Sequence, residues 1–471
     1  MPSDGKPLMA QADEQDVPIR KARGRRLRRL LARSRHIGFT PRVMLRRMIF
    51  WIGALAVGLC AIGFAAGANH ANHLYHQLIA ITRFAPFIVA PAGLALVAWL
   101  TRRFFPGSQG SGIPQAIAAL QMRDEEQRRS VLSLKLAFGK IVLTLLGLLA
   151  GASVGREGPT VQVGASIMLT LGKWVRFPRI ELERGLILAG GAAGIAAAFN
   201  TPLAGVMFAI EEMSRSFEER TSGTVLTAVI VAGLLSLAVL GNYLYFGHSA
   251  ATLGSPHEWI AVPITGIVCG LLGGIFSRIL IETSRGLPGA AGRFAREKPL
   301  WFAAACGGVL ALIGLFSGSH TYGTGYFEAR TIVEGGHALP QTYGILKMLA
   351  NIVSYVSGIP GGIFSPSLAV GAGFGQNLAA LMPGIPTGAV VLLSMAAYFG
   401  GVVQAPITAF VIVIEMTASN SMVLPLMAAA LIGSGASRLI CPTPVYKALA
   451  EAFLARPAHA AKTQAPSQHI P

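Results

Sequence analysis

Glycine and proline interrupt the apolar part of this chain at three places, each directly before a run with helical character. These places are Gly110-Ser-Gly-Ile-Pro114, Gly155-Arg-Glu-Gly-Pro159 and Gly361-Gly-Ile-Phe-Ser-Pro366. Proline suits the first turn of a helix, because its fixed φ favours helix entry and its missing N–H has no intrahelical partner there. Each motif therefore predicts a helix that starts inside apolar surroundings, with free backbone N–H groups and about half a positive charge.

The composition places these helix starts in a membrane. Charged residues are 13% and hydrophobic residues 53% of the 471, whereas an ordinary soluble domain has about 25% charged residues. Helix N-termini within a membrane need partners for their N–H groups, and anions bind there readily. The chain carries no phosphate-binding loop, catalytic triad or zinc signature. We therefore expect an integral membrane protein that moves anions, and not an enzyme.

Many of the apolar runs are shorter than the roughly 20 residues that cross a bilayer. Short runs interrupted by glycine or proline are typical of broken helices in transporters and channels. The expected apolar helices lie at residues 48–66, 87–100, 132–151, 160–171, 185–199, 202–213, 223–246, 259–281, 300–317, 344–357, 366–382, 387–400, 404–417 and 421–440. The expected fold class is an all-α integral membrane protein.

The charge distribution predicts how the chain is oriented. Thirteen Lys and Arg residues stand against four Asp and Glu residues in 1–48, so this segment supplies half of the net charge of +18. The positive-inside rule places the basic N-terminal arm, residues 1–47, in the cytoplasm. The loops rich in Lys and Arg are expected on the same side, and they are 123–129, 173–184 and 278–298. The loops poor in Lys and Arg are expected outside, and they are 67–86 and 245–257.

The basic arm leaves an alternative from a different class of protein open. A run such as Arg23-Gly-Arg-Arg-Leu-Arg-Arg29 suits a membrane-anchored scaffold that binds nucleic acid or anionic lipid. The arm directly precedes the first apolar run, which is the arrangement that the positive-inside rule describes. We therefore expect no nucleic acid partner.

The chain contains an internal repeat. The segment from Phe199 to Glu211 reappears as the segment from Val403 to Glu415, and in both copies a proline precedes the glutamate by nine residues. The glycine-rich motifs that contain Pro159 and Pro366 are offset by nearly the same distance. Two repeat halves, about 48–246 and 259–452, are therefore expected to meet around a site near the membrane midplane.

These motifs resemble the CLC family of chloride channels and chloride/proton exchangers. GSGIP, GREGP and GGIFSP occur in this order, together with FNTPLAGVMFAIEEM and Pro444-Val-Tyr446, over about residues 50–452. The resemblance implies a CLC-type broken-helix bundle of two inverted repeats, with a transmembrane domain at 48–452 and a short C-terminal tail at 453–471. It also implies a bacterial type without soluble regulatory domains, spanning the inner membrane many times as a homodimer with one pore in each subunit.

The resemblance further implies a central site for a dehydrated anion. Its ligands would be the hydroxyls of Ser111 and Tyr446 and the backbone N–H groups of Ile363 and Phe364. Neutral hydroxyl and amide donors replace the water around chloride and still release the ion. Taken alone, Ser111 also suits a packing or capping residue and Tyr446 an interfacial one. Bound chloride is the only ligand expected; no cofactor and no metal site are predicted.

An outer anion position is implied at the backbone of Gly155, Arg156 and Glu157, together with Ser365. Glu157 is the main candidate for chemistry, because an acid in an apolar segment is costly and is retained for function. Its carboxylate competes with an anion for the same N–H groups, and loses its charge when it is protonated. The prediction is a proton-linked gate, and the alternative is a structural pair of Arg156 and Glu157.

Glu212 resembles the inner proton-transfer glutamate of the CLC exchangers. It follows Glu157 by 55 positions, and family channels commonly lack an acid there. Chloride/proton antiport is therefore the predicted function, and a passive chloride channel, gated by voltage or pH, is the alternative. One acid of the pair Glu211 and Glu212 is expected to be an ordinary helix-end residue, and Glu415 a structural polar group.

Three positions distinguish the chain from branches of the family. Ser111 stands where the nitrate-preferring branch has proline, and Pro159 stands where the fluoride-exporting branch usually has threonine. Gln115 follows the first motif where the well-known bacterial exchangers are acidic. The first two positions favour chloride as the transported anion.

Overall fold

The computed structural model describes residues 41–174, 180–214, 219–241, 243–336 and 338–455. The chain divides into two compact units, residues 1–49 and 50–471, and the fold below is that of the second unit. The predictions for residues 1–40 of the basic arm and for the tail after residue 455 lie outside the described residues. α2 begins at Pro41, so it runs through the expected boundary between arm and membrane domain.

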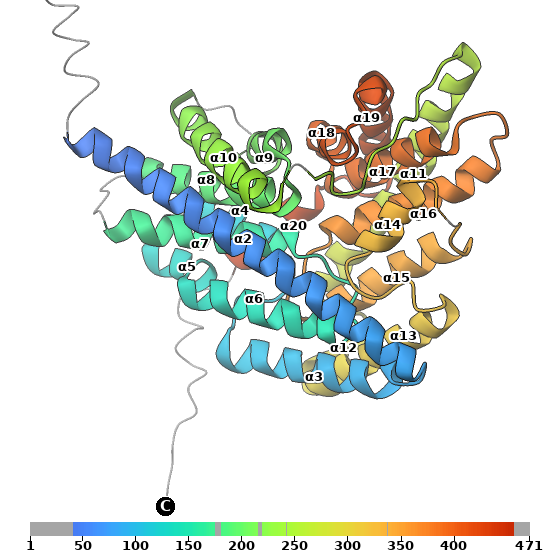
Figure 1. The fold of residues 1–471 in the computed structure, drawn as a ribbon. Helices are drawn as coiled ribbons and strands as arrows, with labels where there is room; N and C mark the ends of the chain where they lie inside the picture. Colours follow the sequence, from blue (N-terminus) through green and yellow to red (C-terminus); the bar gives the residue numbers. More distant parts are fainter. Residues whose placement is uncertain (1–40, 175–179, 215–218, 242, 337, 456–471) are drawn as a thin grey trace, which may run out of the picture. The chain divides into compact units, whose positions relative to one another are not determined.

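Helices account for nearly all of the described chain, which contains no β-strand. The first half contains, in order, α2 (Pro41–Ile81), α3 (Pro86–Phe104), α4 (Ile113–Gln121), α5 (Glu125–Val131), α6 (Leu134–Leu149), α7 (Glu157–Trp174), α8 (Ile180–Phe199), α9 (Pro202–Phe208), the π-helical turn η1 (Ala209–Ser214) and α10 (Glu219–Leu240) (Figure 1). The second half contains η2 (Pro256–Ile260), α11 (Ala261–Arg285), α12 (Gly289–Glu297), α13 (Pro299–Phe316), α14 (Tyr326–Val333), α15 (Tyr343–Val356), α16 (Phe364–Ala380), α17 (Thr387–Val403), α18 (Pro406–Thr417), η3 (Asn420–Met422), α19 (Val423–Ile440) and α20 (Val445–Leu454).

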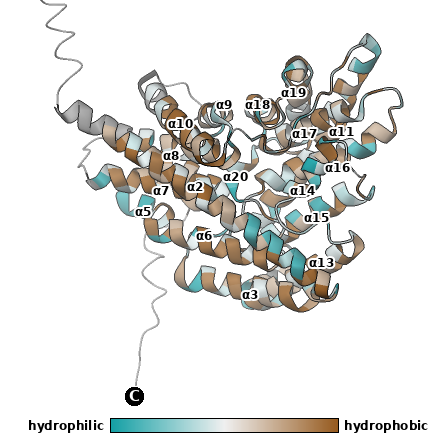
Figure 2. Cartoon of the chain, in the orientation of Figure 1, coloured by the Kyte–Doolittle hydropathy of each residue, from teal (hydrophilic) through white to brown (hydrophobic). Residues whose placement is uncertain are grey.

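Six of these helical segments, within the described residues, are long and apolar enough to cross a membrane. They are Met48–Ile81, Pro86–Phe104, Glu125–Leu149, Pro256–Arg285, Pro299–Phe316 and Asn420–Ile440. Helices such as α3 and α10 consist largely of hydrophobic residues (Figure 2), several of which are exposed. Other helices are much shorter: α9 has 7 residues, α4 has 9 and α18 has 12. The structure thus confirms a multi-pass bundle with broken helices.

The core of each half is a helix that is buried on every side. In α17, all residues from Ala389 to Val403 are buried, and the helix packs against α11, α16 and α19. In α8, the buried stretch is 185–199, and the helix packs against α7 and α10. Close contact depends on glycine: a Cβ on Gly164 of α7 would lie 2.2 Å from the carbonyl oxygen of Gly190 on α8. Small residues allow helix backbones to approach in this way in membranes.

The prediction of a loop at 67–86 is wrong. α2 continues to Ile81, and only the last few residues of the predicted loop connect it to α3. Ala68, Ala71 and Tyr75 are buried at helical spacing, while Asn69, His70 and His73 between them are exposed. The helix is amphipathic here, and a search for apolar runs misses it. Among the described residues, no three His, Cys, Asp or Glu side chains lie together as metal ligands.

The three predicted basic loops also contain helix. Residues 125–131 form α5, because Asp124 caps its N-terminus by accepting a hydrogen bond from the N–H of Glu126. Its charges are paired, as shown by the 2.6 Å contact between Arg128 and Glu183. The segment 278–298 contains the end of α11 and all of α12. Charged helices at a membrane surface carry no apolar run by which to recognise them.

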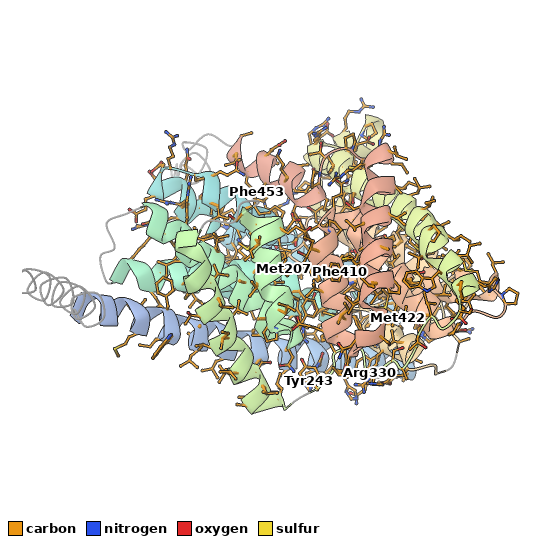
Figure 3. The ribbon with its side chains drawn as sticks, turned by 90° about the horizontal axis from the view of Figure 1, so that it is seen from above. Met207, Tyr243, Arg330, Phe410, Met422 and Phe453 are labelled. Atoms are coloured by element: carbon orange, nitrogen blue, oxygen red, sulfur yellow. The ribbon has the colours of Figure 1, made fainter. Side chains whose placement is uncertain are left out.

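The two copies of the repeated segment lie side by side. Pro202 begins α9 and Pro406 begins α18, and the two helices are in contact. In the view from above, Met207 of α9 and Phe410 of α18 are neighbours near the centre (Figure 3). The repeat therefore brings its two proline-initiated helices together.

Each copy caps the other with its glutamate. The carboxylate of Glu211 accepts hydrogen bonds from the N–H and the hydroxyl of Thr408, at 2.6 and 2.8 Å, in the first turn of α18. The carboxylate of Glu415 accepts from the N–H groups of Leu203 and Ala204 in the first turn of α9, at 3.0 and 2.6 Å. This exchange is what a twofold relation between inverted repeats produces. It confirms Glu415 as a structural group and identifies Glu211 as its counterpart.

We expect Glu415→Ala to lower the free energy of unfolding by about 1–2 kcal/mol, because the first turn of α9 loses its carboxylate cap. The measurement is the thermal unfolding midpoint of the purified protein in detergent. Glu451→Ala is the control, since Glu451 is an exposed acid on α20. Equal midpoints for the two variants would contradict the capping role.

Candidate functional site

The three glycine-containing motifs meet through backbone hydrogen bonds. Gly155 and Gly362 exchange both of their N–H···O bonds, each at 2.7 Å. The N–H of Gly110 donates to the carbonyl of Ile359 at 3.1 Å, and the carbonyl of Gly110 accepts from the N–H of Gly361 at 3.0 Å. Segments that are about 45 to 250 positions apart in the sequence are thereby fixed around one site.

Three helices begin at this junction, as the sequence predicted. Pro114, Pro159 and Pro366 lie in the first turns of α4, α7 and α16. All three first turns are buried, so their leading N–H groups point into the protein interior and not into water. The junction combines three positive helix ends in one small volume.

The predicted central-site residues lie together. The hydroxyls of Ser111 and Tyr446 are buried and interact with each other, and neither has a hydrogen-bond partner elsewhere among the described residues. Ile363 is the N-cap of α16 and Phe364 its first residue, which leaves their N–H groups without intrahelical acceptors. Buried hydroxyls are nearly always paired, so this set of donors suits an anion.

The backbone around Ser111 fits tightly against α7. A Cβ on Gly158 would lie 2.2 Å from Oγ of Ser111 and 2.8 Å from its carbonyl oxygen. Gly112, with φ of +105°, turns the chain into α4. Gln115 holds this turn: its side-chain oxygen accepts from the N–H of Gly112, and its amide donates to the carbonyl of Gln109 at 2.7 Å. Gln115, the residue that follows the first motif, is thus a buried amide that holds the turn.

The carboxylate of Glu157 lies where the starts of α7 and α16 meet. It is fully buried and interacts with the N–H of Ser365 at the start of α16. Its Oε1 lies 3.9 Å from Nε of Arg156 and 3.4 Å from the hydroxyl of Tyr245. A Cβ on Gly155 would lie 2.4 Å from the other carboxylate oxygen. Arg156 is therefore one partner among several, and the carboxylate rests on a helix N-terminus that suits an anion.

The two neighbouring glutamates of η1 point to different partners. Glu211 reaches α18, as described above, whereas Glu212 is buried and interacts electrostatically with Tyr446. The π-helical turn spans both residues, and such turns often occur at functional sites. The structure thus assigns the helix-end role to Glu211 and brings Glu212 towards the central hydroxyls.

Sequence reasoning missed two buried lysines and a tyrosine. Nζ of Lys140 on α6 donates to the carbonyls of Ser108 and Gly110, at 2.6 and 2.7 Å. Lys347 on α15 makes equivalent bonds to the loop before α14. The sequence feature that could have identified both lysines is a charged residue inside an apolar run. Tyr245 follows α10 in a segment without any motif, and nothing in the sequence pointed to it.

These features define a class: a polytopic membrane transport protein with a buried site of helix ends and neutral donors. The chain matches the family described as voltage gated chloride channel over residues 93–438. It belongs to this family, the CLC proteins, which confirms the resemblance of its motifs and its fold class.

Relatives along nearly the whole chain are named as exchangers. It is 29% identical over 466 residues to the H(+)/Cl(-) exchange transporter ClcA of Yersinia pestis bv. Antiqua (strain Angola), covering 94% of this chain and 93% of that relative. It is 30% identical over 476 residues to the H(+)/Cl(-) exchange transporter ClcA of Cronobacter sakazakii (strain ATCC BAA-894), with coverages of 94% and 96%.

Solved structures share the fold. A slow cyanobacterial Cl-/H+ antiporter superimposes with a TM-score of 0.75 at 27% identity, covering 89% of this chain and 99% of its own. A CLC-type fluoride/proton antiporter superimposes with a TM-score of 0.73 at 22% identity, covering 87% and 99%. At that identity the second comparison shows the fold alone.

We expect Gly158→Ala to weaken chloride binding by at least about tenfold, because the new methyl group forces Ser111 and its backbone out of position. Isothermal titration calorimetry with chloride measures this. Gly63→Ala is the matched control, since a Cβ on Gly63 meets no atom within 4 Å. Unchanged binding in Gly158→Ala would remove Ser111 from the site.

Proposed function

We propose that this protein exchanges chloride for protons across the membrane. The observation that carries the proposal is the position of the Glu157 carboxylate at the N-terminus of α16, beside the donors that suit an anion. The exchange activity named for the relatives supports it, as does the antiport named for the cyanobacterial structure.

The arrangement suggests how the two ions are coupled. Chloride binds at the central site through the hydroxyls of Ser111 and Tyr446 and the N–H groups of Ile363 and Phe364. Deprotonated Glu157 closes the outer position that Gly155, Arg156 and Ser365 frame. Protonation removes its charge, so that it no longer competes for the N–H groups and chloride replaces it.

Glu212 is the proposed inner proton station. It is buried and interacts electrostatically with Tyr446, and we place it on the inner side of the central hydroxyls, with Glu157 on the outer side. A proton that moves between them need not follow the intracellular entry route of chloride. An acid at this position favours exchange over the alternative of a passive chloride channel.

The orientation and location follow from charge. We place the N-terminal arm in the cytoplasm and the protein in the bacterial inner membrane, because its relatives are bacterial and the arm is strongly basic. In Figure 3, Tyr243 and Arg330 lie at one edge and Phe453 at the opposite edge. Tyr243 directly precedes the segment 245–257, which is poor in Lys and Arg, and its edge is the proposed outer side.

We also propose a homodimer, through the face formed by α9, α10, α18 and α19, which lie next to one another (Figure 1). This face exposes large apolar side chains: Leu203, Ile230, Leu234, Ile407, Leu424 and Leu431. Single-molecule photobleaching of labelled protein in liposomes is expected to show two steps per particle. A uniform single step would reject the dimer.

The decisive experiment uses proteoliposomes with a chloride gradient, no pH gradient, and valinomycin with potassium to set the voltage. We expect chloride efflux to drive protons uphill. Glu157→Gln is expected to abolish proton movement and to retain chloride flux, because the neutral side chain neither carries a proton nor competes with chloride.

The other outcomes separate the alternatives. Chloride flux without proton movement in the unmodified protein would make it a channel, and would remove the proposed proton-transfer role of Glu212. If Glu212 is the inner station, Glu212→Gln stops proton movement as well, whereas Glu451→Gln on the exposed side of α20 changes nothing. Deletion of residues 1–45 tests the scaffold: a transporter keeps its flux, and a scaffold loses its partner.

A further inference from the structure

Tyr245 contacts the gate from a segment that carries no motif. The side chain is 2% exposed, and its hydroxyl lies 3.4 Å from Oε1 of Glu157 and 3.4 Å from Oγ of Ser365. A phenolic hydroxyl has one proton to donate and lone pairs to accept. Tyr245 is thus able to donate to the carboxylate while it accepts from Ser365, and so to link the starts of α7 and α16.

The ring of Tyr245 is held in place by its neighbours. Phe199, Phe246 and Tyr326 each meet it edge-on, with centroid distances of 5.1, 4.9 and 4.7 Å. The guanidinium of Arg156 lies 5.9 Å from its centre. A donor that is already oriented loses little entropy when it binds a carboxylate. The hydroxyl is therefore a fixed feature of the outer position.

We propose that Tyr245 is a positioning residue that holds Glu157 across the outer anion position and thereby sets the pH at which the gate opens. The proposal rests on the proposed function of Glu157 as a proton-linked gate. A hydrogen bond to a charged acceptor is stronger than one to a neutral acceptor. The contact consequently stabilises the closed, deprotonated carboxylate more than the protonated side chain, which is released.

The test variant leaves the other polar side chains around the Glu157 carboxylate unchanged. The charged and titratable side chains that act on Glu157, besides Tyr245, are Arg156 beside it, Tyr243 from the segment after α10 and Tyr446 from α20. Tyr245→Phe leaves all three in place and keeps the ring contacts. A changed pH dependence in this variant therefore reports the missing hydroxyl.

The test measures chloride flux as a function of pH in proteoliposomes. Without the hydroxyl, the carboxylate accepts a proton more readily, so we expect the flux curve of Tyr245→Phe to move to higher pH by about half a unit to one unit. The proton-to-chloride ratio stays unchanged, because Glu157 is still present. Chloride binding at neutral pH, measured by calorimetry, is expected to be about two- to tenfold tighter, since the competing carboxylate is held less firmly.

Tyr326→Phe is the matched control. Its ring packs on Tyr245, but its hydroxyl accepts a hydrogen bond from Arg330 at 3.1 Å and does not face the carboxylate. It should leave the pH curve in place. Tyr245→Leu, a second variant without the hydroxyl, should move the curve in the same direction as Tyr245→Phe.

Three results would overturn the proposal. The first is that the flux curve of Tyr245→Phe does not move along the pH axis. The second is that the curve of Tyr326→Phe moves by the same amount. The third is that Tyr245→Phe still changes chloride binding when Glu157→Gln is also present. Failure of the proposed function looks different: Glu157→Gln alone would then keep proton-coupled flux, whatever residue stands at position 245.

Discussion

The structure depends on the backbone hydrogen bonds that allow helices to end inside the membrane. Hydrocarbon offers no partner for a free N–H or C=O, and each unsatisfied group costs several kcal/mol. The glycine loops solve this problem by binding one another, as in the two 2.7 Å bonds between Gly155 and Gly362. The N–H groups that remain at the starts of α4, α7 and α16 are then the ones available to an anion.

The two halves of the internal repeat contain equivalent stabilising contacts. Lys140 and Lys347 are both fully buried, and each donates hydrogen bonds to loop carbonyls in its own half. A buried ammonium requires such acceptors. Glu211 and Glu415 instead cross between the halves and cap each other's short helices. The first pair fixes loops within a half, and the second joins the halves next to the transport site.

The donors of the central site, which are hydroxyl and amide groups, are neutral, and the charged groups Glu157 and Glu212 lie around them. Hydroxyl and amide donors bind chloride without trapping it, whereas a lysine among them would hold it too strongly. The ammonium group of Lys140, the buried lysine of this half, donates to the carbonyl oxygens of Ser108 and Gly110. In the proposed gate, the carboxylate of Glu157 competes with an anion, and the side chains that contact it, Tyr245 and Arg156, set how firmly it does so.

The sequence by itself determined where helices begin, that the chain is duplicated and which family it belongs to, because proline, glycine and the repeated Pro-to-Glu spacing act locally. It failed where a helix has no apolar run: α2 beyond residue 66 is recognised as helix by the buried faces of Ala68, Ala71 and Tyr75. Only the tertiary structure decided which of two adjacent glutamates caps a helix and which lies beside Tyr446, and that Tyr245 contacts Glu157 from 88 positions away. Such contacts depend on how distant segments pack, and no local pattern of residues encodes them.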